Sequence, residues 1–455
     1  MWNREEIDGP SLKRVRVHSF AHATFPQDAP SYVDRLQRLY PHSRDQDCQL
    51  DDKLHRYYVH GEPYSLSVSG WWKMFFEEFD PEAVSERIVQ KQLDRPGFQS
   101  LALGDASSSE ISESNLASSV YNLALCVLAL ERRGDEEFLD ELRAVATVAK
   151  DDYERFCGRV PFSVEGIVSL GQRLLMDLHK PHGRSCYYLV LLYTASYGPE
   201  AQAARIAQTW HLHGRLESLK GTYLHKKIEL FINAMARSME SNGSSYVAVE
   251  NLLREELPAH EYAAEAVMAQ IAWAQDPQVW NHPIMQRFFD SEVRGESLEF
   301  RKFRAWLSTK RRWTPLRLEW SVYNEDLKVA GQIDSLWKDL DSGTLVMVDW
   351  KRASKLLTDD VDELASQSFG KMGTTCCSHL YDAAWSHYFV QQTLYAYLLD
   401  SKYGLAVRKM MLVQCHPHVC GPDFNEAPLV ADIEFAKSLT TVLRNRPDAV
   451  ASLGA

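Results

Sequence analysis

Two aspartates and a lysine near the middle of the C-terminal half have the types and spacing of a metal-dependent hydrolytic site. Asp334 ends one apolar run, Asp349 and Lys351 end the next, and a polar turn over 338–343 joins the two runs. The pattern predicts a β-hairpin in which Asp349 and Lys351, two residues apart, share a face. A carboxylate from each strand, with a lysine beside one of them, can hold a divalent metal and a water nucleophile.

Each of these residues also has a simpler interpretation, because an aspartate at a strand end is usually a turn residue. The neighbouring segments therefore decide between the two. Upstream, apolar residues at helical spacing predict a helix that begins near Gly221, with Thr222 as its N-cap. His225 and Glu229 lie four residues apart on one face of that helix.

Two further segments complete the set. The run over 318–323 predicts a strand with Glu319 and Ser321 on one face, and the run over 388–399 predicts a helix with Gln391 and Tyr395 one turn apart. Five pieces then occur in a fixed order: Gly221 to His225, Glu319, Gly331 to Asp334, Asp349 to Lys351, and Gln391 to Tyr395.

This order resembles the PD-(D/E)XK nuclease superfamily, and most closely its RecB-like exonuclease branch, which includes mitochondrial genome-maintenance and CRISPR-associated exonucleases. A segment from His55 to Ser69 also resembles the hairpin and helix start that open many of these domains. The resemblance covers about residues 50–95 and 205–420. It implies an α/β (α+β) fold of the restriction-endonuclease type, a mixed central β-sheet flanked by helices, here with a large helical insertion.

The resemblance also implies a Mg²⁺- or Mn²⁺-dependent deoxyribonuclease, with one or two ions. It would be an exonuclease that acts on single-stranded ends or flaps in DNA repair, replication or recombination. The implied metal ligands are His225, Asp334, Asp349 and the carbonyl of Trp350, and the implied catalytic residues are Asp334, Asp349, Lys351, Gln391 and Tyr395.

Some roles stay open at this stage. Glu319 would bind a second metal, or it would orient the metal ligands without contacting the metal. Glu229 would do the latter, or simply pair with a neighbouring lysine. Tyr395 would position the phosphate or belong to the core. Asp349 stands where the motif more often has Glu, and its shorter side chain puts the metal geometry in question.

The net charge of −12 is unusual for a protein that binds nucleic acid, so the local distribution of charge matters more. From Arg294 to Arg317, eight basic residues face two acidic ones, a net of +6. We expect this segment either to bind DNA phosphates or to form a solvated helix face. The expected nucleic-acid contacts are Lys310, Arg311, Arg312 and Arg352.

The eight cysteines form no C-x-x-C pair, and no disulfide or zinc pattern is apparent. Only Cys415 and Cys420 follow the helix over 388–399, so no iron–sulfur cluster is expected. We predict an intracellular, reducing location, nuclear or cytoplasmic rather than mitochondrial, because the N-terminus is acidic and lacks the apolar core of a secretory signal. No membrane association is expected, RNA is not excluded, and protein partners are not predicted.

The predicted organisation has five parts: an irregular arm over 1–50, a nuclease hairpin and helix over 51–95, a linker and helical insertion over 96–200, the nuclease core over 201–425, and a C-terminal helix or tail over 426–455. Within the second part, Ser69 is the expected cap of a helix over 71–79.

Other classes compete with an exonuclease. One is a nuclease-derived protein that binds nucleic acid without cutting it, and another is an endonuclease of the mobile-element or viral type. An unrelated hydrolase or scaffold is the third, but no G-x-S-x-G, Walker or HExxH motif supports it.

Overall fold

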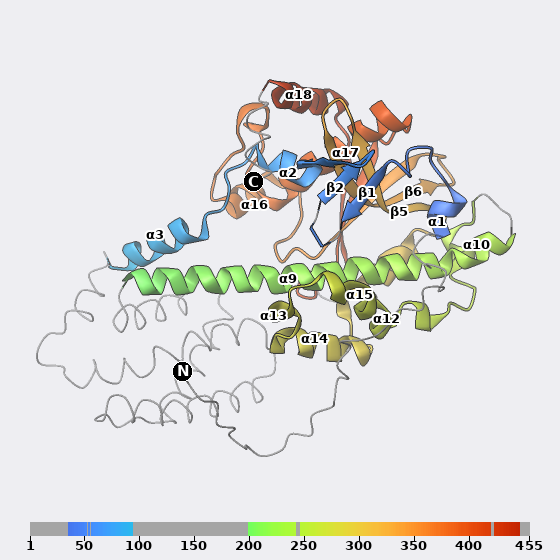
Figure 1. The fold of residues 1–455 in the computed structure, drawn as a ribbon, viewed down its shortest axis with the longest axis horizontal. Helices are drawn as coiled ribbons and strands as arrows, with labels where there is room; N and C mark the ends of the chain where they lie inside the picture. The colour runs from blue at the N-terminus through green and yellow to red at the C-terminus, as the bar shows by residue number, and fades with distance from the viewer. Residues whose placement is uncertain are drawn as a thin grey trace, which may run out of the picture.

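The fold is built on one mixed β-sheet with helices on both faces (Figure 1), as the sequence predicts. The computed structural model describes residues 35–51, 53–54, 56–93, 199–242, 246–419 and 423–445. The linker and the helical insertion expected over 96–200 lie almost entirely outside these residues. So does most of the arm expected over 1–50.

A long central hairpin organises the six-stranded sheet. Its strands are β4 (Leu66–Ser67), β5 (Trp313–Asn324), β6 (Val329–Asp339), β7 (Leu345–Lys351), β8 (Lys409–Gln414) and β9 (Asn425–Val430). β5 pairs antiparallel with β6 along almost its whole length. The other edge of β6 is shared, because β7 pairs with residues 335–338 and β4 with residues 329–330. A parallel β7–β8 pair and an antiparallel β8–β9 pair complete the mixed sheet.

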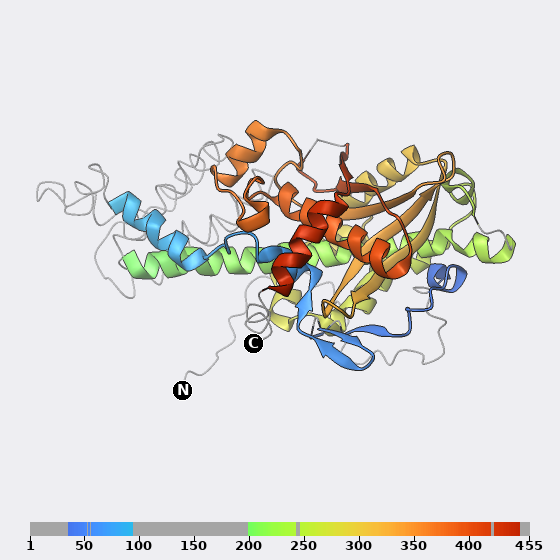
Figure 2. The ribbon, with the colours of Figure 1, turned by 90° about the horizontal axis from the view of Figure 1, so that it is seen from above.

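Two hydrophobic cores lie on the two faces of this sheet. On one face, α9 (Pro199–Met235) and α15 (Leu298–Thr309) cover Trp337, Val348 and Trp350. On the other, α17 (Ala384–Tyr403), α2 (Val68–Lys73) and α18 (Ile433–Arg444) cover Ile333, Met347 and their neighbours. Figure 2 shows α18 and α17 on the side of the sheet opposite α9.

Helix α9 also packs against a third group of helices. Its other side contacts α12 (Ala264–Ile271), α13 (Pro277–Trp280) and α14 (Pro283–Val293) through a separate apolar cluster. The remaining helices of the described residues are α1 (Arg35–Leu39), α3 (Pro81–Leu93), α10 (Arg237–Asn242), α11 (Val249–Leu252) and α16 (Val361–Ser368), with short 3₁₀ turns η2 (Ala259–Glu261), η3 (Ala272–Ala274) and η4 (Thr375–Cys377).

Helix α9 corrects one detail of the sequence analysis. It runs without a break through Gly221 and Thr222, so Thr222 is not an N-cap. Its hydroxyl instead donates to the carbonyl of Ser218, one turn back in the same helix. A glycine within a helix costs only about 1 kcal/mol, and the apolar contacts on two sides of α9 offset that cost.

The N-terminal region contains more structure than expected. Strands β1 (Cys48–Asp51), β2 (Arg56–Val59) and β3 (Glu62–Tyr64) form a small antiparallel sheet, so the β2–β3 hairpin is confirmed, and α1 and β1 lie where an irregular arm was predicted. The hairpin turns at His60 and Gly61, both with positive φ. The cap of α2 is Ser67, whose hydroxyl accepts from Gly70 N at 3.0 Å, and not Ser69.

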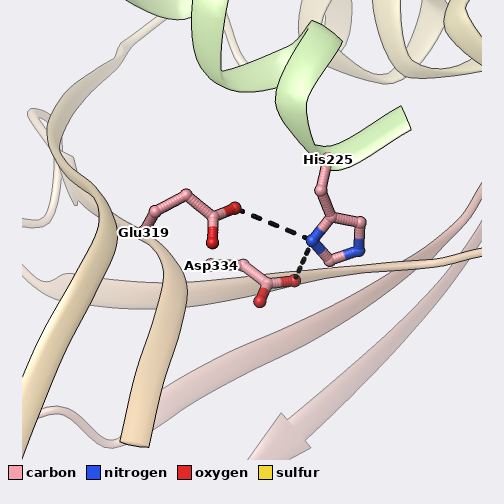
Figure 3. Close-up of side chains that lie close together, drawn as sticks. All are labelled: His225, Glu319 and Asp334. Carbon is pink, nitrogen blue, oxygen red and sulfur yellow. Dashed lines mark ion pairs between the residues drawn. The ribbon is translucent and has the colours of Figure 1, made fainter. Parts of the chain in front are cut away.

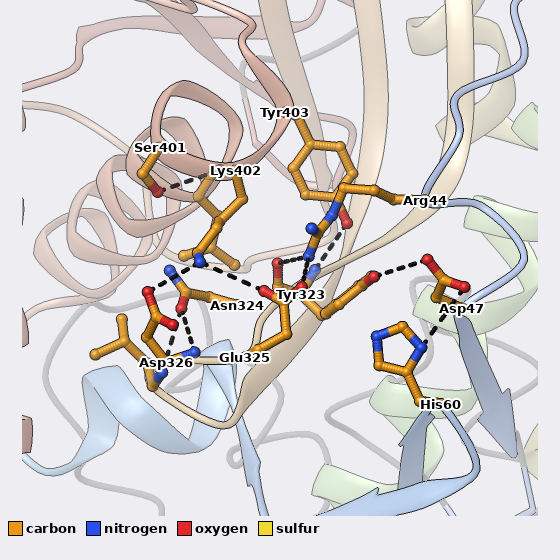
Figure 4. A network of polar contacts seen from close by, with 12 residues as sticks. Arg44, Asp47, His60, Tyr323, Asn324, Glu325, Asp326, Ser401, Lys402 and Tyr403 are labelled. Atoms are coloured by element: carbon orange, nitrogen blue, oxygen red, sulfur yellow. Dashed lines mark hydrogen bonds and ion pairs between the residues drawn. The ribbon is translucent and has the colours of Figure 1, made fainter.

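A polar network joins this N-terminal sheet to the large one (Figure 4). The Arg44 guanidinium lies 3.9 Å from the centre of the Tyr323 ring and 2.8 Å from Glu325. Tyr323 donates to Asp47 at 3.0 Å, and the Tyr403 hydroxyl accepts from the backbone of Tyr323 at 3.0 Å. These contacts hold the β1–β2 hairpin against β5, and the hairpin in turn forms one wall of the cleft described below.

Candidate metal centre and active site

The site lies where β7 separates from β6. The pairs Leu318–Ser335 and Trp320–Ile333 place Glu319 of β5 opposite Asp334 of β6. The last β6–β7 pair, Ser335 with Val348, places Asp334 next to Asp349 on its other side. Three carboxylates on adjacent strands therefore lie side by side across the sheet.

His225 approaches two of these carboxylates from α9. Its Nδ1 lies 3.5 Å from Asp334 Oδ2 and 3.7 Å from Glu319 Oε1, as Figure 3 shows. One ligand atom from each of these three residues lies within 4.8 Å of the others, and all three side chains are part-buried. The contacts exceed hydrogen-bond length, whereas two ligands of one Mg²⁺ lie about 3 Å apart. Only a small contraction would bring the three donors around one ion.

The backbone of Trp350 fixes two members of this group. Its N–H donates to Asp334 Oδ2 at 2.9 Å, in place of a strand partner, and its carbonyl lies 2.9 Å from Nε2 of His225. Because a carbonyl can only accept, Nε2 carries the proton and Nδ1 faces the carboxylates. In this structure the Trp350 carbonyl orients the histidine, and its expected role as a metal ligand stays a prediction.

Asp349 and Lys351 form a buried pair beside this group. The Lys351 ammonium lies 2.7 Å from Asp349 Oδ2 and 4.6 Å from the centre of the Tyr388 ring. As the sequence predicts, both residues project from the same side of β7. Among the described residues, Asp349 is not grouped with His225, Glu319 and Asp334, so it lies next to the candidate metal position rather than within it.

Burial and mutual repulsion raise the pKa of Asp349. Burial has the larger effect and the charge of Asp334 adds to it, while Lys351 and His225 only partly offset them, so the pKa reaches about 7. Burial lowers the pKa of Lys351, but the two aspartates outweigh it and the pKa is raised. Lys351 is therefore a permanent cation, and Asp349 exchanges its proton near neutrality.

The same carboxylates act on His225. Burial lowers its pKa, but Asp334 and Glu319 outweigh burial and raise the pKa to about 9. Without a metal, the site holds an imidazolium between two carboxylates at neutral pH. A cation is thus already favoured at this position, which fits a divalent metal.

Glu319 has an unusual backbone conformation. Its φ is 42°. Among the described residues, no other non-glycine residue within a strand of the large sheet has a positive φ. Leu318 before it packs on the core under α9, and Trp320 after it belongs to the core under α17. Residues two apart in a strand normally share a face, so the left-handed Glu319 reverses the faces. Strained backbone of this kind concentrates at functional sites.

Helix α17 contributes residues from the opposite face. Tyr388, Gln391 and Tyr395 share one side of it, and the Gln391 side chain hydrogen-bonds the Tyr395 hydroxyl. Tyr395 is buried against Gly331, where an added Cβ would lie 2.7 Å from its ring. Tyr395 therefore packs and positions rather than contacting substrate. Sequence analysis missed Tyr388, although its place one turn before Gln391 is a usable signal.

Glu229 is buried and ion-paired with Lys226 on the same helix, which is the simpler of the two readings of that residue. It contacts the cleft next to His225 but is not part of the group of three ligands.

Three basic residues between Arg294 and Arg317 form ion pairs with acidic residues far away in the sequence. Lys310 lies 2.7 Å from Glu426, and Arg312 lies 3.0 Å from Asp341. Arg317 is buried against Asp45. Lys310 precedes β5 by three residues, which puts it more than about 20 Å along the strand from Glu319. Lys310, Arg312 and Arg317 are therefore paired with carboxylates, and within the 310–312 run Arg311 and Arg312 are exposed.

Arg352 also differs from its expected role. It directs one nitrogen at Glu217 of α9 and another at Glu299 of α15, the latter at 3.1 Å, and its side chain is only 8% exposed. This corrects the prediction that Arg352 binds nucleic acid. Its position next to Lys351 makes it a brace between β7 and the helix that carries His225.

A cleft of about 700 Å³ opens onto the candidate metal centre. Its floor includes Glu319 and Gln332, one wall is the side of α9 that carries His225, and the opposite wall includes Tyr57 of the N-terminal sheet. Trp273 of η3 lies on the α12 side.

No protein-family model and no curated protein matches this chain. The resemblance to the nuclease superfamily therefore rests on the ordered motifs, and the structure itself shows a mixed α/β fold. No helix among the described residues is long and apolar enough to cross a bilayer. Within the same residues, Cys48, Cys376, Cys377 and Cys415 are free thiols.

Proposed function

We propose that this protein is a metal-dependent deoxyribonuclease of the PD-(D/E)XK type that hydrolyses phosphodiester bonds at single-stranded ends or flaps. The observation that carries the proposal is the meeting of His225, Glu319 and Asp334 at one point, next to the Asp349–Lys351 pair. These residues come from α9, β5, β6 and β7, and sequence alone orders them without bringing them together.

The ligand set fits Mg²⁺ or Mn²⁺. Two carboxylates supply the hard oxygens that both ions prefer, and the imidazole favours Mn²⁺. His225, Glu319 and Asp334 would hold the ion, with Asp349 adjacent for a second. A bound ion supplies Lewis acidity toward the phosphate and a water of lowered pKa.

The protein's own groups supply the remaining chemistry. Lys351 stays protonated, so it stabilises the negative charge that builds on a phosphate oxygen and does not act as a base. Asp349, with a pKa of about 7, can accept a proton near neutrality. Trp350 keeps the His225 ring in the orientation that directs Nδ1 at Asp334 and Glu319.

Digestion of end-labelled DNA tests the proposal. Linear single-stranded, flapped duplex and circular single-stranded substrates are incubated with Mg²⁺, Mn²⁺ or EDTA. We expect metal-dependent products from the first two and little from the circle. Asp334→Asn and Lys351→Ala should abolish cleavage, while Asp341→Asn, in the turn of the same hairpin, should not.

Binding without any metal-dependent product would overturn the proposal in favour of a non-cleaving binding protein. Rapid cleavage of the circle would overturn the end-directed part and favour an endonuclease.

A further inference from the structure

The cleft at the metal centre continues into a second hollow. This second hollow, of about 500 Å³, is lined by Phe79, Trp210 and the adjoining part of α9. The two hollows share Ser218 and Gln275, so they form one groove. Their common wall is a stripe of α9 residues three or four positions apart: His211, Arg215, Ser218, Thr222 and His225.

The groove is long enough for several nucleotides. From Trp210 to His225 the helix rises about 22 Å, at about 1.5 Å per residue. One end reaches Glu319 and His225 of the candidate metal centre, and the other reaches Phe79, two residues before α3. An extended polymer lying along α9 would therefore present one end to the site.

Exposed aromatic rings line both hollows. Trp273 is 54% exposed where it lines the hollow at the metal centre, and its indole N–H donates to the Gln270 carbonyl at 3.0 Å. Phe79 is 63% exposed, and its ring centre lies 5.7 Å from that of Trp210 in the second hollow. Large exposed aromatic side chains in a groove mark a binding surface rather than a core.

The charges along the groove are matched in pairs. Arg215 is ion-paired with Asp276, and His211 lies 2.9 Å from Glu82. With a net charge of −12 on the whole chain, general attraction for phosphates is weak. Affinity for a nucleic acid in this groove would have to come from its bases.

We propose that this groove binds single-stranded DNA by base stacking, with Trp273 as the exposed stacking residue in the hollow at the metal centre. The proposal deepens, and rests on, the proposed nuclease function, because the groove matters through the site to which it leads. Stacking needs unpaired bases and tolerates any sequence. A duplex keeps its bases paired and cannot use these rings, which makes the single strand the preferred substrate.

Binding without cleavage tests this proposal. Fluorescence anisotropy in EDTA is measured with labelled oligothymidylate, an abasic strand of equal length and charge, and a duplex of equal length. We expect oligothymidylate to bind at least tenfold more tightly than the other two, with a shallow dependence on salt. Trp273→Ala should weaken oligothymidylate binding by about tenfold, and Trp273→Phe should retain most of it.

A matched control is Tyr246→Ala. Tyr246 is also exposed, but it lies beside Lys338 at the far end of β6. That variant should bind as the wild type does. Equal binding of the abasic strand and oligothymidylate, or wild-type binding by Trp273→Ala, would overturn the proposal.

The two proposals fail separately. Loss of stacking-dependent binding with metal-dependent cleavage intact overturns the groove and leaves the nuclease. Stacking-dependent binding without cleavage supports the groove and overturns the nuclease.

Discussion

Glu319 lies across from Asp334, between the Leu318–Ser335 and Trp320–Ile333 pairs of β5 and β6, and it has a left-handed backbone that no neighbour in the strand shares. The conformation switches β5 from one core to the other at this residue. A carboxylate that the sequence places in an ordinary strand thereby joins the candidate metal centre. Placing this carboxylate at the candidate metal centre would explain why the strained backbone is retained.

That strain gives a stability test. Glu319→Gly should be more stable than Glu319→Ala by about 1 kcal/mol, because glycine adopts positive φ without steric cost. At Ser321, two residues on in the same strand, the order should reverse, since glycine is ordinarily the weaker strand residue. Urea unfolding of the four variants measures both differences. The same order at both positions would contradict the strain assignment.

The sequence predicted one part of this site well and another poorly. Strand alternation places Asp349 and Lys351 on one face, because two residues of regular strand need no other information. The rule does not foresee the left-handed backbone of Glu319, although Glu319 and Ser321 both line the cleft. The sequence also could not show that Arg317 and Arg352 are ion-paired, because their partners Asp45 and Glu217 are far away in the sequence.

Metal binding should release protons. His225 has a pKa raised to about 9, and it must lose its Nδ1 proton before it can ligate. Mn²⁺ affinity should therefore rise with pH up to about 9, by up to about tenfold per pH unit. His225→Ala should weaken Mn²⁺ binding and flatten this dependence. Calorimetric titration at several pH values measures both effects, and an unchanged slope in His225→Ala would rule out the histidine as the source.

The stability of the metal-free protein should fall as pH rises, whereas its metal affinity should increase. A raised histidine pKa contributes stability that is fully present below the ordinary value and is lost as pH rises through about 9. The raised pKa of Asp349 acts in the same direction, over a window that ends near pH 7. The metal-free protein should thus become less stable from acidic to alkaline pH on account of this site. In His225→Ala, the loss between neutral pH and about 9 should disappear from unfolding curves.

Gly331 should tolerate no larger residue. A Cβ there would lie 2.7 Å from the Tyr395 ring and 2.9 Å from Val68, so Gly331→Ala should cost about 1–3 kcal/mol through overpacking. Gly221→Ala is the matched control, because nothing lies within 4 Å of its Cβ position in α9. That change should stabilise by up to about 1 kcal/mol. Thermal unfolding measures the change in stability of both variants. A change of the same sign in both would contradict the close packing at Gly331.

Arg352→Lys should destabilise the protein by roughly 3 kcal/mol, since lysine cannot reach both carboxylates and a buried acid loses its partner. The salt dependence of DNA binding should not change, because the positive charge is kept and Arg352 faces protein. Arg311→Ala, at an exposed position, should alter stability by less than about 0.5 kcal/mol. A normal stability for Arg352→Lys would contradict the role of Arg352 as a brace between β7 and the two helices.

The most direct test of the metal centre is electron paramagnetic resonance of Mn²⁺ titrated into the purified protein. Free Mn²⁺ gives a strong signal that weakens on binding, so the number of bound ions and their affinity follow from one titration. We predict saturable binding of one or two ions to the wild type and loss of at least one in Asp334→Asn. Equal signals with wild type, Asp334→Asn and no protein would contradict a metal centre formed by His225, Glu319 and Asp334.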